Sequence, residues 1–294
     1  RHGHGIIRGI DTAAAKAMPG VLAVYTGEDL KKAGYGTLKN IIPLKNRDGT
    51  PMAKPPRYPL AMDKVRCVGE PVAAVIAESV NQAKDAAEAV ELDIEPLPAV
   101  VDMEHADAPD AARIHDEAPN NVALDFYYGD TEKVAEAFAK AVHVTKLRLV
   151  NSRVVVSAME PRACIAEHDT ESGRYTLNVG CQGVFGMKGQ LVDVLGVTPD
   201  KVRVLTGNVG GSFGMKAAVY SEYLPCLLAA RELGRPVKWT AERGESFLSD
   251  HQGRDQVFNC ELALDKEGHF LAWRAIGYSN VGSQLANVAP LMGT

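Results

Sequence analysis

The stretch that decides the fold is Gly207-Asn208-Val209-Gly210-Gly211-Ser212-Phe213-Gly214-Met215-Lys216. Its first eight residues include four glycines, which allow the backbone to adopt positive φ and to bring its N–H groups close to a ligand. The residue pattern predicts a strand over 201–205 before this loop and a helix over 216–233 after it. A glycine loop in that position can direct several N–H donors and a helix dipole at an anion.

Two familiar phosphate-binding motifs do not account for this loop. The Gly-Lys-Ser/Thr of a Walker loop does not follow Gly207 or Gly210 at the required distance. The Gly-x-Gly-x-x-Gly of a dinucleotide site is also missing from the loop. The loop can therefore be interpreted as an anion site of another kind. Two alternatives stay open: a tight strand–helix turn that needs the glycines only for its geometry, and a phosphate site for a nucleotide.

A second strand end precedes the loop in the chain. The alternating pattern of 174–179 predicts a strand, and 184–195 predicts a helix that ends before Gly196. Between them lies Cys181-Gln182-Gly183. The amide of Gln182 can serve a polar centre in a cleft as both donor and acceptor. The alternative is an exposed glutamine in a turn.

Two further polar clusters are candidates for chemistry. Glu160, in Met159-Glu160-Pro161-Arg162, is interpreted as a functional carboxylate or, alternatively, as one side of an ion pair with Arg162 or a neighbour. His251 has no second His or Cys at metal-ligand spacing, so a structural role is favoured over metal binding. The residues themselves predict no protein metal ligand.

The order of helix and strand patterns predicts a mixed α/β protein, of the α+β class, in three parts. Residues 1–101 read as a compact α/β unit, and residues 102–130 as a connector with little periodicity. Residues 131–294 read as a second, more strand-rich domain.

Composition narrows the class of protein. The 294 residues carry 32 Lys and Arg against 37 Asp and Glu, a net charge of −5, and no basic block, so nucleic acid is not an expected partner. No apolar run is long enough for a membrane span. The five scattered cysteines contain no Cys-x-x-Cys, which argues against a disulfide framework and favours a reducing compartment, here the cytoplasm.

Seven ordered segments together resemble the large, molybdenum-binding subunit of the xanthine dehydrogenase/aldehyde oxidase family, the molybdenum hydroxylases. Among its branches, the aerobic carbon monoxide dehydrogenase-like enzymes look most similar. The matching segments are 10–21, 24–27, 68–75, 159–162, 180–182, 210–216 and 234–237. The resemblance implies an α/β hammerhead domain over 1–101, followed by the first, incomplete part of the molybdopterin-binding domain from 131.

The resemblance also implies roles for individual residues. Gln182 would hydrogen-bond beside an oxygen ligand of molybdenum, and the loop of Gly210, Gly211, Ser212, Phe213 and Gly214 would present N–H groups to the molybdenum–pyranopterin centre. Gln182 and Phe213 would be the catalytic residues, with Phe213 at the border of the substrate channel. The cofactor would be molybdopterin, including its cytosine dinucleotide form, which itself holds the metal.

The implied reaction is oxidative hydroxylation of a small molecule (an aldehyde, carbon monoxide or an N-heterocycle) with water as the source of oxygen. Electrons would pass to iron–sulfur and FAD subunits, in a dimer of heterotrimers. Three features depart from the family pattern: Ser212 replaces a frequent glycine, Ala217 replaces the glutamate of xanthine-oxidising members, and the active-site loop with its general-base glutamate is expected beyond Thr294. The alternative function is a binding module, a fragment without cofactor or catalysis.

Overall fold

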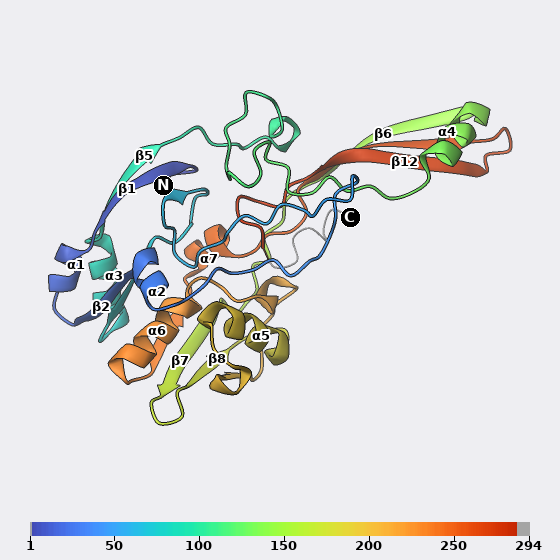
Figure 1. Ribbon diagram of the computed structural model, residues 1–294. Coiled ribbons are helices and arrows are strands. Elements are labelled where there is room, and N and C mark those ends of the chain that lie inside the picture. Colours follow the sequence, from blue (N-terminus) through green and yellow to red (C-terminus); the bar gives the residue numbers. More distant parts are fainter. Residues whose placement is uncertain (1, 287–294) are drawn as a thin grey trace. The chain divides into compact units, whose positions relative to one another are not determined.

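A computed structural model describes residues 2–286, which form a mixed α/β structure (Figure 1). The chain divides into two compact units, which are described separately. Unit 1 consists of Arg1–Asn40, Pro56–Ala99 and Val155–His251. Unit 2 consists of Ile41–Pro55, Val100–Val154 and Gln252–Thr294.

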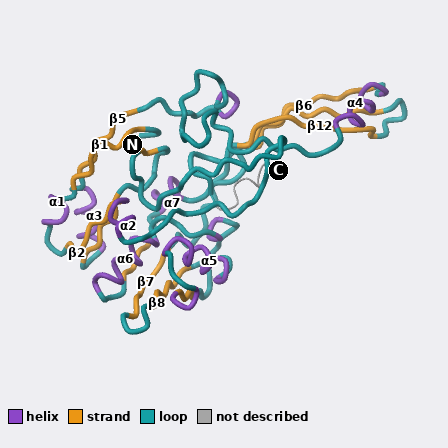
Figure 2. The backbone as a smooth tube through the Cα atoms, in the orientation of Figure 1, coloured by secondary structure: helices purple, strands orange, loops and turns teal. Residues whose placement is uncertain are grey.

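The N-terminal part of unit 1 contains two small antiparallel sheets with short helices between their strands (Figure 2). The strand orders are β3-β1-β5 and β2-β4. Ser79 begins α3 by accepting a hydrogen bond from the N–H of Gln82, as an N-cap should. The elements are β1 (Gly5–Asp11), α1 (Ala13–Ala17), β2 (Val21–Thr26), α2 (Gly27–Lys32), β3 (Lys64–Val65), β4 (Ala73–Ala77), α3 (Val80–Glu88) and β5 (Glu91–Pro96).

The second part of unit 1 is built on a four-stranded sheet of order β10-β7-β8-β9. Strands β8 and β9 run parallel and are joined by α5, so their carboxyl ends lie at the same edge of the sheet. Its elements are β7 (Ala163–Asp169), β8 (Arg174–Val179), α5 (Val184–Leu195), η2 (Pro199–Lys201), β9 (Val202–Leu205), η3 (Met215–Ala217), α6 (Tyr223–Leu233), β10 (Val237–Thr240) and α7 (Arg243–Ser249).

One hydrophobic core joins the two parts of unit 1. Leu177 of β8 and Leu227 of α6 belong to it, together with Tyr25, Leu30 and Leu60 from the first hundred residues. All five side chains are buried. Unit 1 therefore takes residues from both sides of the expected connector, and the domain boundaries at 101 and 130 stay a prediction.

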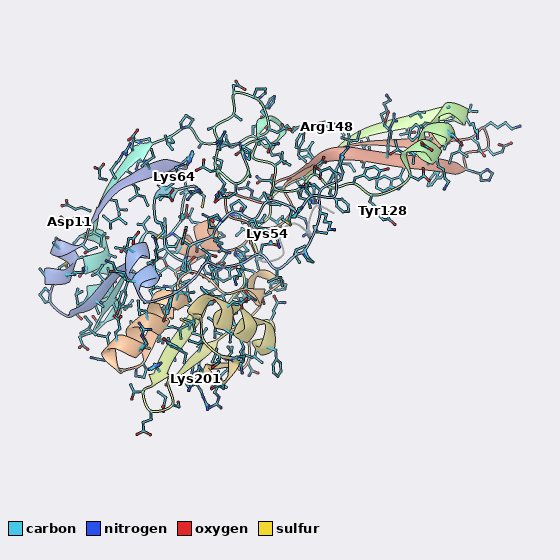
Figure 3. All side chains as sticks on the ribbon, viewed as in Figure 1. Asp11, Lys54, Lys64, Tyr128, Arg148 and Lys201 are labelled. Carbon is cyan, nitrogen blue, oxygen red and sulfur yellow. The ribbon has the colours of Figure 1, made fainter. Side chains whose placement is uncertain are left out.

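Unit 2 contains an antiparallel sheet of order β12-β11-β6. Helix α4 packs beside it, with the guanidinium of Arg274 placed over the ring of Phe138 at 4.4 Å. Arg148 of β6, labelled in Figure 3, forms an ion pair with Glu104 at 2.6 Å. Its elements are η1 (Met103–His105), α4 (Thr131–Lys140), β6 (His143–Asn151), β11 (Gln256–Leu264) and β12 (Phe270–Ser279).

The helix expected over 216–233 begins only at Tyr223, so its predicted start is wrong. After a single 3₁₀ turn at 215–217 the backbone extends at Ala218, with φ −118° and ψ 159°. The interruption has a physical cause: the N–H of Val219, which in a helix over 216–233 would donate to the carbonyl of Met215, donates instead to Oε1 of Gln190, and the hydroxyl of Tyr220 donates to that carbonyl. These bonds replace the helical ladder. No helix in the described part of the chain is long and apolar enough to cross a membrane.

Candidate functional site

The glycine loop leaves β9 at Leu205 and ends in the 3₁₀ turn that begins at Met215. Gly211 and Gly214 have φ of +103° and +94°, which explains why glycine occupies these two positions. Phe213 also has positive φ, at +50°, and its side chain is 78% exposed. A bulky residue in this conformation stores backbone strain, which is found most often at functional sites.

Gln182 binds this loop directly. Its Oε1 accepts hydrogen bonds from the hydroxyl of Ser212 at 2.6 Å and from the N–H of Gly214 at 2.9 Å. A main-chain N–H can only donate, so the amide atom that faces Gly214 must be the oxygen. The other amide end, Nε2, is thereby fixed as an outward donor, and no described residue accepts a hydrogen bond from it.

Three consecutive loop N–H groups, those of Gly211, Ser212 and Phe213, find no acceptor among residues 2–286. Helix α5 begins just after Gln182 and has no side-chain cap at its N-terminus. Unpaired main-chain donors and a free helix N-terminus both favour negative charge nearby. The donor set of this loop therefore fits an anionic group, and it offers neutral donors instead of a counter-charge.

Glu160 lies behind the loop and pairs with Lys216, not with Arg162. Its Oε1 lies 2.8 Å from Nζ of Lys216, and its Oε2 accepts the N–H of Gly210 at 2.8 Å. The hydrogen bond from Lys216, followed by that from Gly210, holds the pKa of the Glu160 carboxyl below its ordinary value. Glu160 therefore forms an ion pair, as expected, but its partner is Lys216, 56 positions away, and the expected partner Arg162 is wrong.

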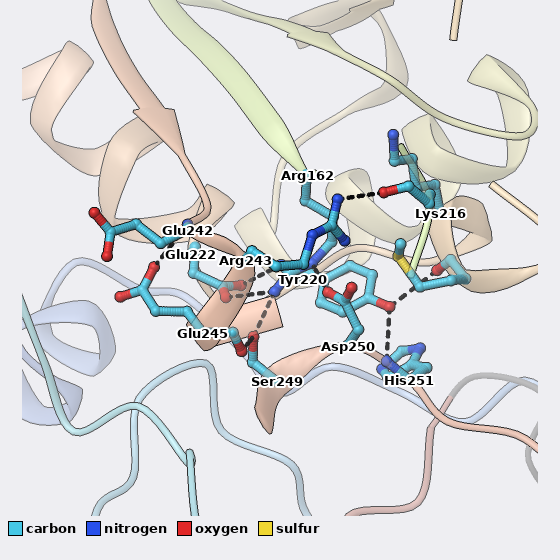
Figure 4. Close-up of polar contacts among 12 residues, drawn as sticks. Arg162, Lys216, Tyr220, Glu222, Glu242, Arg243, Glu245, Ser249, Asp250 and His251 are labelled. Carbon is cyan, nitrogen blue, oxygen red and sulfur yellow. Dashed lines mark hydrogen bonds and ion pairs between the residues drawn. The ribbon is translucent and has the colours of Figure 1, made fainter. Parts of the chain in front are cut away.

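Arg162 is the centre of a buried polar network (Figure 4). Its guanidinium donates to Asp250 at 2.6 Å, to both carboxylate oxygens of Glu222 at 2.8 and 2.9 Å, and to the hydroxyl of Ser249 at 2.7 Å. These partners neutralise a cation that burial would otherwise penalise. The sequence contains no local signal that would join Arg162 to Glu222 or Asp250, which lie 60 and 88 positions away.

Tyr220 connects this network to the loop. Its ring lies between the guanidinium of Arg162, at 3.8 Å, and the stacked ring of His251, at 4.5 Å between ring centroids. Its hydroxyl donates to the carbonyl of Met215 at 3.0 Å and accepts the N–H of His251 at 3.1 Å. His251 therefore has a structural place, and burial together with Arg57 and Arg162 lowers its pKa well below 6.5.

A shallow pocket of about 250 Å³ opens at the carboxyl ends of β8 and β9. It is lined at its polar rim by Glu160, Asn178, Thr206, Asn208 and Lys238. Glu160 lines this pocket and also binds Gly210 of the loop, so the pocket and the loop share one residue. Of the residues expected at the site, Gln182 binds Ser212 and Gly214, and Gly210 binds Glu160. The N–H groups of Gly211 and Phe213 have no acceptor in the described part of the chain.

Comparisons with known proteins cover nearly the whole chain. The family described as "Molybdopterin cofactor-binding domain" matches residues 114–293, and "Aldehyde oxidase and xanthine dehydrogenase, a/b hammerhead domain" matches residues 1–98. Among curated proteins, the 6-hydroxypseudooxynicotine dehydrogenase complex subunit gamma of Paenarthrobacter nicotinovorans is 34% identical, over 98% of this chain and 36% of its own length.

The carbon monoxide dehydrogenase large chain of Afipia carboxidovorans is also 34% identical, over 93% of this chain and 34% of its own. A crystal structure of the Cu,Mo-CO dehydrogenase superposes with a TM-score of 0.83 at 33% identity, covering 94% of this chain and 35% of that one. The chain spans about a third of the length of these curated relatives.

Proposed function

Because this chain belongs to the aldehyde oxidase and xanthine dehydrogenase family of molybdenum hydroxylase large subunits, we propose that its glycine loop and Gln182 hold a molybdenum–molybdopterin cofactor. The protein would hydroxylate a small substrate oxidatively, with water as the oxygen source. Family membership, its similarity to carbon monoxide dehydrogenase and the mixed α/β class with a hammerhead domain confirm the resemblance seen in the sequence.

One observation carries the proposal: Gln182 and the loop 210–214 are joined by hydrogen bonds, and both carry donors that no described residue accepts. The amide oxygen of Gln182 is bound by Ser212 and Gly214, which leaves Nε2 as a donor, and the N–H groups of Gly211, Ser212 and Phe213 have no acceptor among the described residues. Neutral donors that are already oriented stabilise an anionic centre without reorganisation during a reaction. The structure thus fits the cofactor at the level of its donor chemistry.

When bound, the cofactor would supply a two-electron acceptor at the metal. The chain's own residues would then have separate tasks. The N–H groups of Gly211, Ser212 and Phe213 would bind the anionic group, and Nε2 of Gln182 would orient it by donating a hydrogen bond. The ring of Phe213, 78% exposed, would border the path of the substrate and exclude water from it.

The proposal extends to the substrate class, the partner subunits and the form of the cofactor. The relatives include proteins named for nicotine derivatives and for carbon monoxide, so an N-heterocycle, an aldehyde or carbon monoxide is the substrate class we propose. Ala217, next to Lys216, argues against a purine. Some relatives are named as subunits of complexes, which supports iron–sulfur and FAD subunits in a dimer of heterotrimers. The cytosine dinucleotide form of the cofactor belongs to this proposal.

We propose the cytoplasm as the location, since all five cysteines are free in the structure and free thiols persist in reducing compartments.

Metal and pterin analysis of the full-length protein, co-expressed with its partners, tests the proposed function. Wild-type protein is expected to carry stoichiometric molybdenum. Gly211→Val is expected to lower that content by about tenfold or more, because a Cβ at this position would lie 3.1 Å from the Phe213 ring and 3.3 Å from the Ala158 methyl group, at φ +103°.

Gly173→Val is the matched control. Gly173 also has positive φ, at +64°, but no described atom lies within 4 Å of the position of its added Cβ. This variant also places a β-branched residue at positive φ, in the turn between β7 and β8 and away from the loop, so it should keep the wild-type molybdenum content. A wild-type protein that is well folded but free of metal would contradict the proposal and favour a binding module.

A further inference from the structure

Glu160 holds both ends of the second half of the glycine loop, from Gly210 to Lys216. At the start of this segment, Gly210 donates its N–H to Oε2 of Glu160 at 2.8 Å, and its carbonyl accepts the N–H of Glu160 at 3.0 Å. At the end of the segment, Nζ of Lys216 donates to Oε1 of Glu160 at 2.8 Å and to its carbonyl at 2.9 Å. The ends of the segment are therefore tied to one residue that lies about fifty positions away in the chain.

Lys216 ties Gln182 to the same group. The carbonyl of Lys216 accepts the N–H of Gln182 at 3.1 Å. The N–H of Lys216 donates at 3.0 Å to the hydroxyl of Ser212, which in turn donates to Oε1 of Gln182. A single residue thus fixes the backbone and, through Ser212, the side chain of Gln182.

Burial shows why the partner must be a carboxylate. The side chain of Lys216 is 1% exposed, whereas that of Glu160 is 41% exposed. A buried ammonium group requires an anion and hydrogen-bond acceptors close to it. Glu160 provides both, and water reaches its remaining surface.

Two glycines make room for this carboxylate. A Cβ at Gly210 would lie 2.6 Å from Cβ of Glu160, and a Cβ at Gly180 would lie 2.9 Å from its Oε1. Both distances are too short for real atoms. These two glycines therefore allow Glu160 to approach the backbone closely, and any side chain there would push the carboxylate away.

We propose that Glu160 and Lys216, here called the clasp, are positioning residues that hold the loop 210–214 and Gln182 in the geometry that receives the cofactor. The inference rests on the proposed function for the identity of the ligand. Neither residue acts on the ligand itself; each acts through the main-chain donors and the amide that it fixes.

Amide hydrogen exchange of the full-length protein tests the clasp without reference to activity. In Lys216→Met, the N–H groups of Gly210 and Gly214 should exchange at least about tenfold faster than in wild type, because their acceptors are no longer held in place. The carboxylate of Glu160 stays solvated in this variant, so no buried charge is left unpaired.

Val194→Ala is the control for lost stability. Val194 is 1% exposed in α5 and makes no contact with the clasp among the contacts described. It should lower the melting temperature but change the exchange of Gly210 and Gly214 by less than about twofold. Equal acceleration in Lys216→Met and Val194→Ala would overturn the proposal, because the clasp would then act only on global stability.

A second variant covers the case in which Lys216→Met does not fold. Gly210→Ala displaces Glu160 by contact and leaves Lys216 intact; it should accelerate exchange at Gly214 in the same way, and unchanged exchange there would refute the clasp. The two proposals can fail separately. If exchange is fast in the variants but the wild-type protein contains no molybdenum, the clasp is supported and the cofactor proposal is contradicted. If the wild-type protein contains molybdenum but exchange in the variants is unchanged, the cofactor proposal is supported and the clasp is contradicted.

Discussion

The side chain of Gln182 has two ends with different tasks. Its oxygen is bound by Ser212 and Gly214, so the loop itself decides where the nitrogen points. Ser212, which stands where the family often has glycine, adds a hydrogen bond that a glycine could not provide. At this scale the departure from the family pattern strengthens the orientation of Gln182.

Phe213 is expected to matter for turnover and not for folding. Its ring is 78% exposed, so Phe213→Ala should change the free energy of unfolding by no more than about 0.5 kcal/mol. Turnover of the loaded enzyme should fall by about tenfold because the substrate is positioned less well. Steady-state kinetics and urea unfolding measure the two effects, with Phe270→Ala, 76% exposed on β12, as the control. Equal losses of activity and stability would make Phe213 a packing residue.

His251 is expected to make stability depend on pH. Burial, Arg57 and Arg162 lower its pKa well below 6.5, so below pH 6.5 the unfolded chain takes up a proton that the folded protein does not. The contribution of His251 to the free energy of unfolding should therefore be fully present above pH 6.5. As the pH falls below 6.5, the free energy of unfolding should decrease by up to about 1.4 kcal/mol per pH unit.

Urea unfolding of wild type and His251→Phe over this pH range isolates the contribution of His251. Phenylalanine keeps the stacking on Tyr220, and Nε2 of His251 is buried without a partner, so the substitution removes no described hydrogen bond of that atom. Below pH 6.5 the variant should lose stability less steeply than wild type. Identical slopes would show that His251 does not titrate in this way.

Single residues also show what the sequence could and could not predict. Strand, turn and helix patterns place Gln182 and the loop at two strand ends, but their assignment to a site came from the resemblance to the family and stays a prediction. The partners of Glu160 and Arg162 could not be found, because Lys216 is 56 positions from the first, and Glu222 and Asp250 are 60 and 88 from the second. Such pairings depend on tertiary packing and leave no local pattern.

Among the elements, helix α5 has the clearest local requirement. It begins after Gly183, whose φ of +128° and ψ of 103° suit glycine almost exclusively. Gly183→Ala should therefore lower the free energy of unfolding by about 1–2 kcal/mol, even though no described atom lies within 4 Å of the added Cβ. The strain would also displace Gln182, its neighbour.

Gly186→Ala, in the same helix, is expected to change the free energy of unfolding in the opposite direction. Gly186 lies inside α5 and is equally open to a Cβ, so alanine should raise the free energy of unfolding by about 0.5–1 kcal/mol. Chemical denaturation measures both variants. A stabilising effect of Gly183→Ala would show that the conformation of Gly183 carries no strain.

Elements that bury a regular face were predicted well, and those that depend on distant contacts were not. The expected ranges of β8 and α5 agree with the structure. Strand β1 was not predicted because glycines such as Gly5 and Gly9 are typical of loops. In the structure Gly5 lies in a strand, at a position where a Cβ would collide with Ile94 of the neighbouring strand β5. The start of α6 was placed too early because Val219 donates to Gln190, and the Tyr220 hydroxyl donates to Met215, in place of the helical bond between Val219 and Met215.

On the scale of the whole molecule, unit 1 unites the hammerhead region with the sheet that carries the site. Tyr25 of β2 donates to Glu232 of α6 at 2.8 Å, in addition to the shared hydrophobic core. The region matched by the hammerhead family therefore supports the same helix that packs on β7. Periodicity in the sequence delimits segments, but it does not show which segments share a core.

The most direct measurement of the central claim is an anomalous difference map, recorded at the molybdenum edge from crystals of the full-length protein. A peak facing Nε2 of Gln182 and the N–H groups of Gly211, Ser212 and Phe213 is the result that we predict. A map with no peak at these donors, or with its molybdenum at another part of the protein, would contradict the claim.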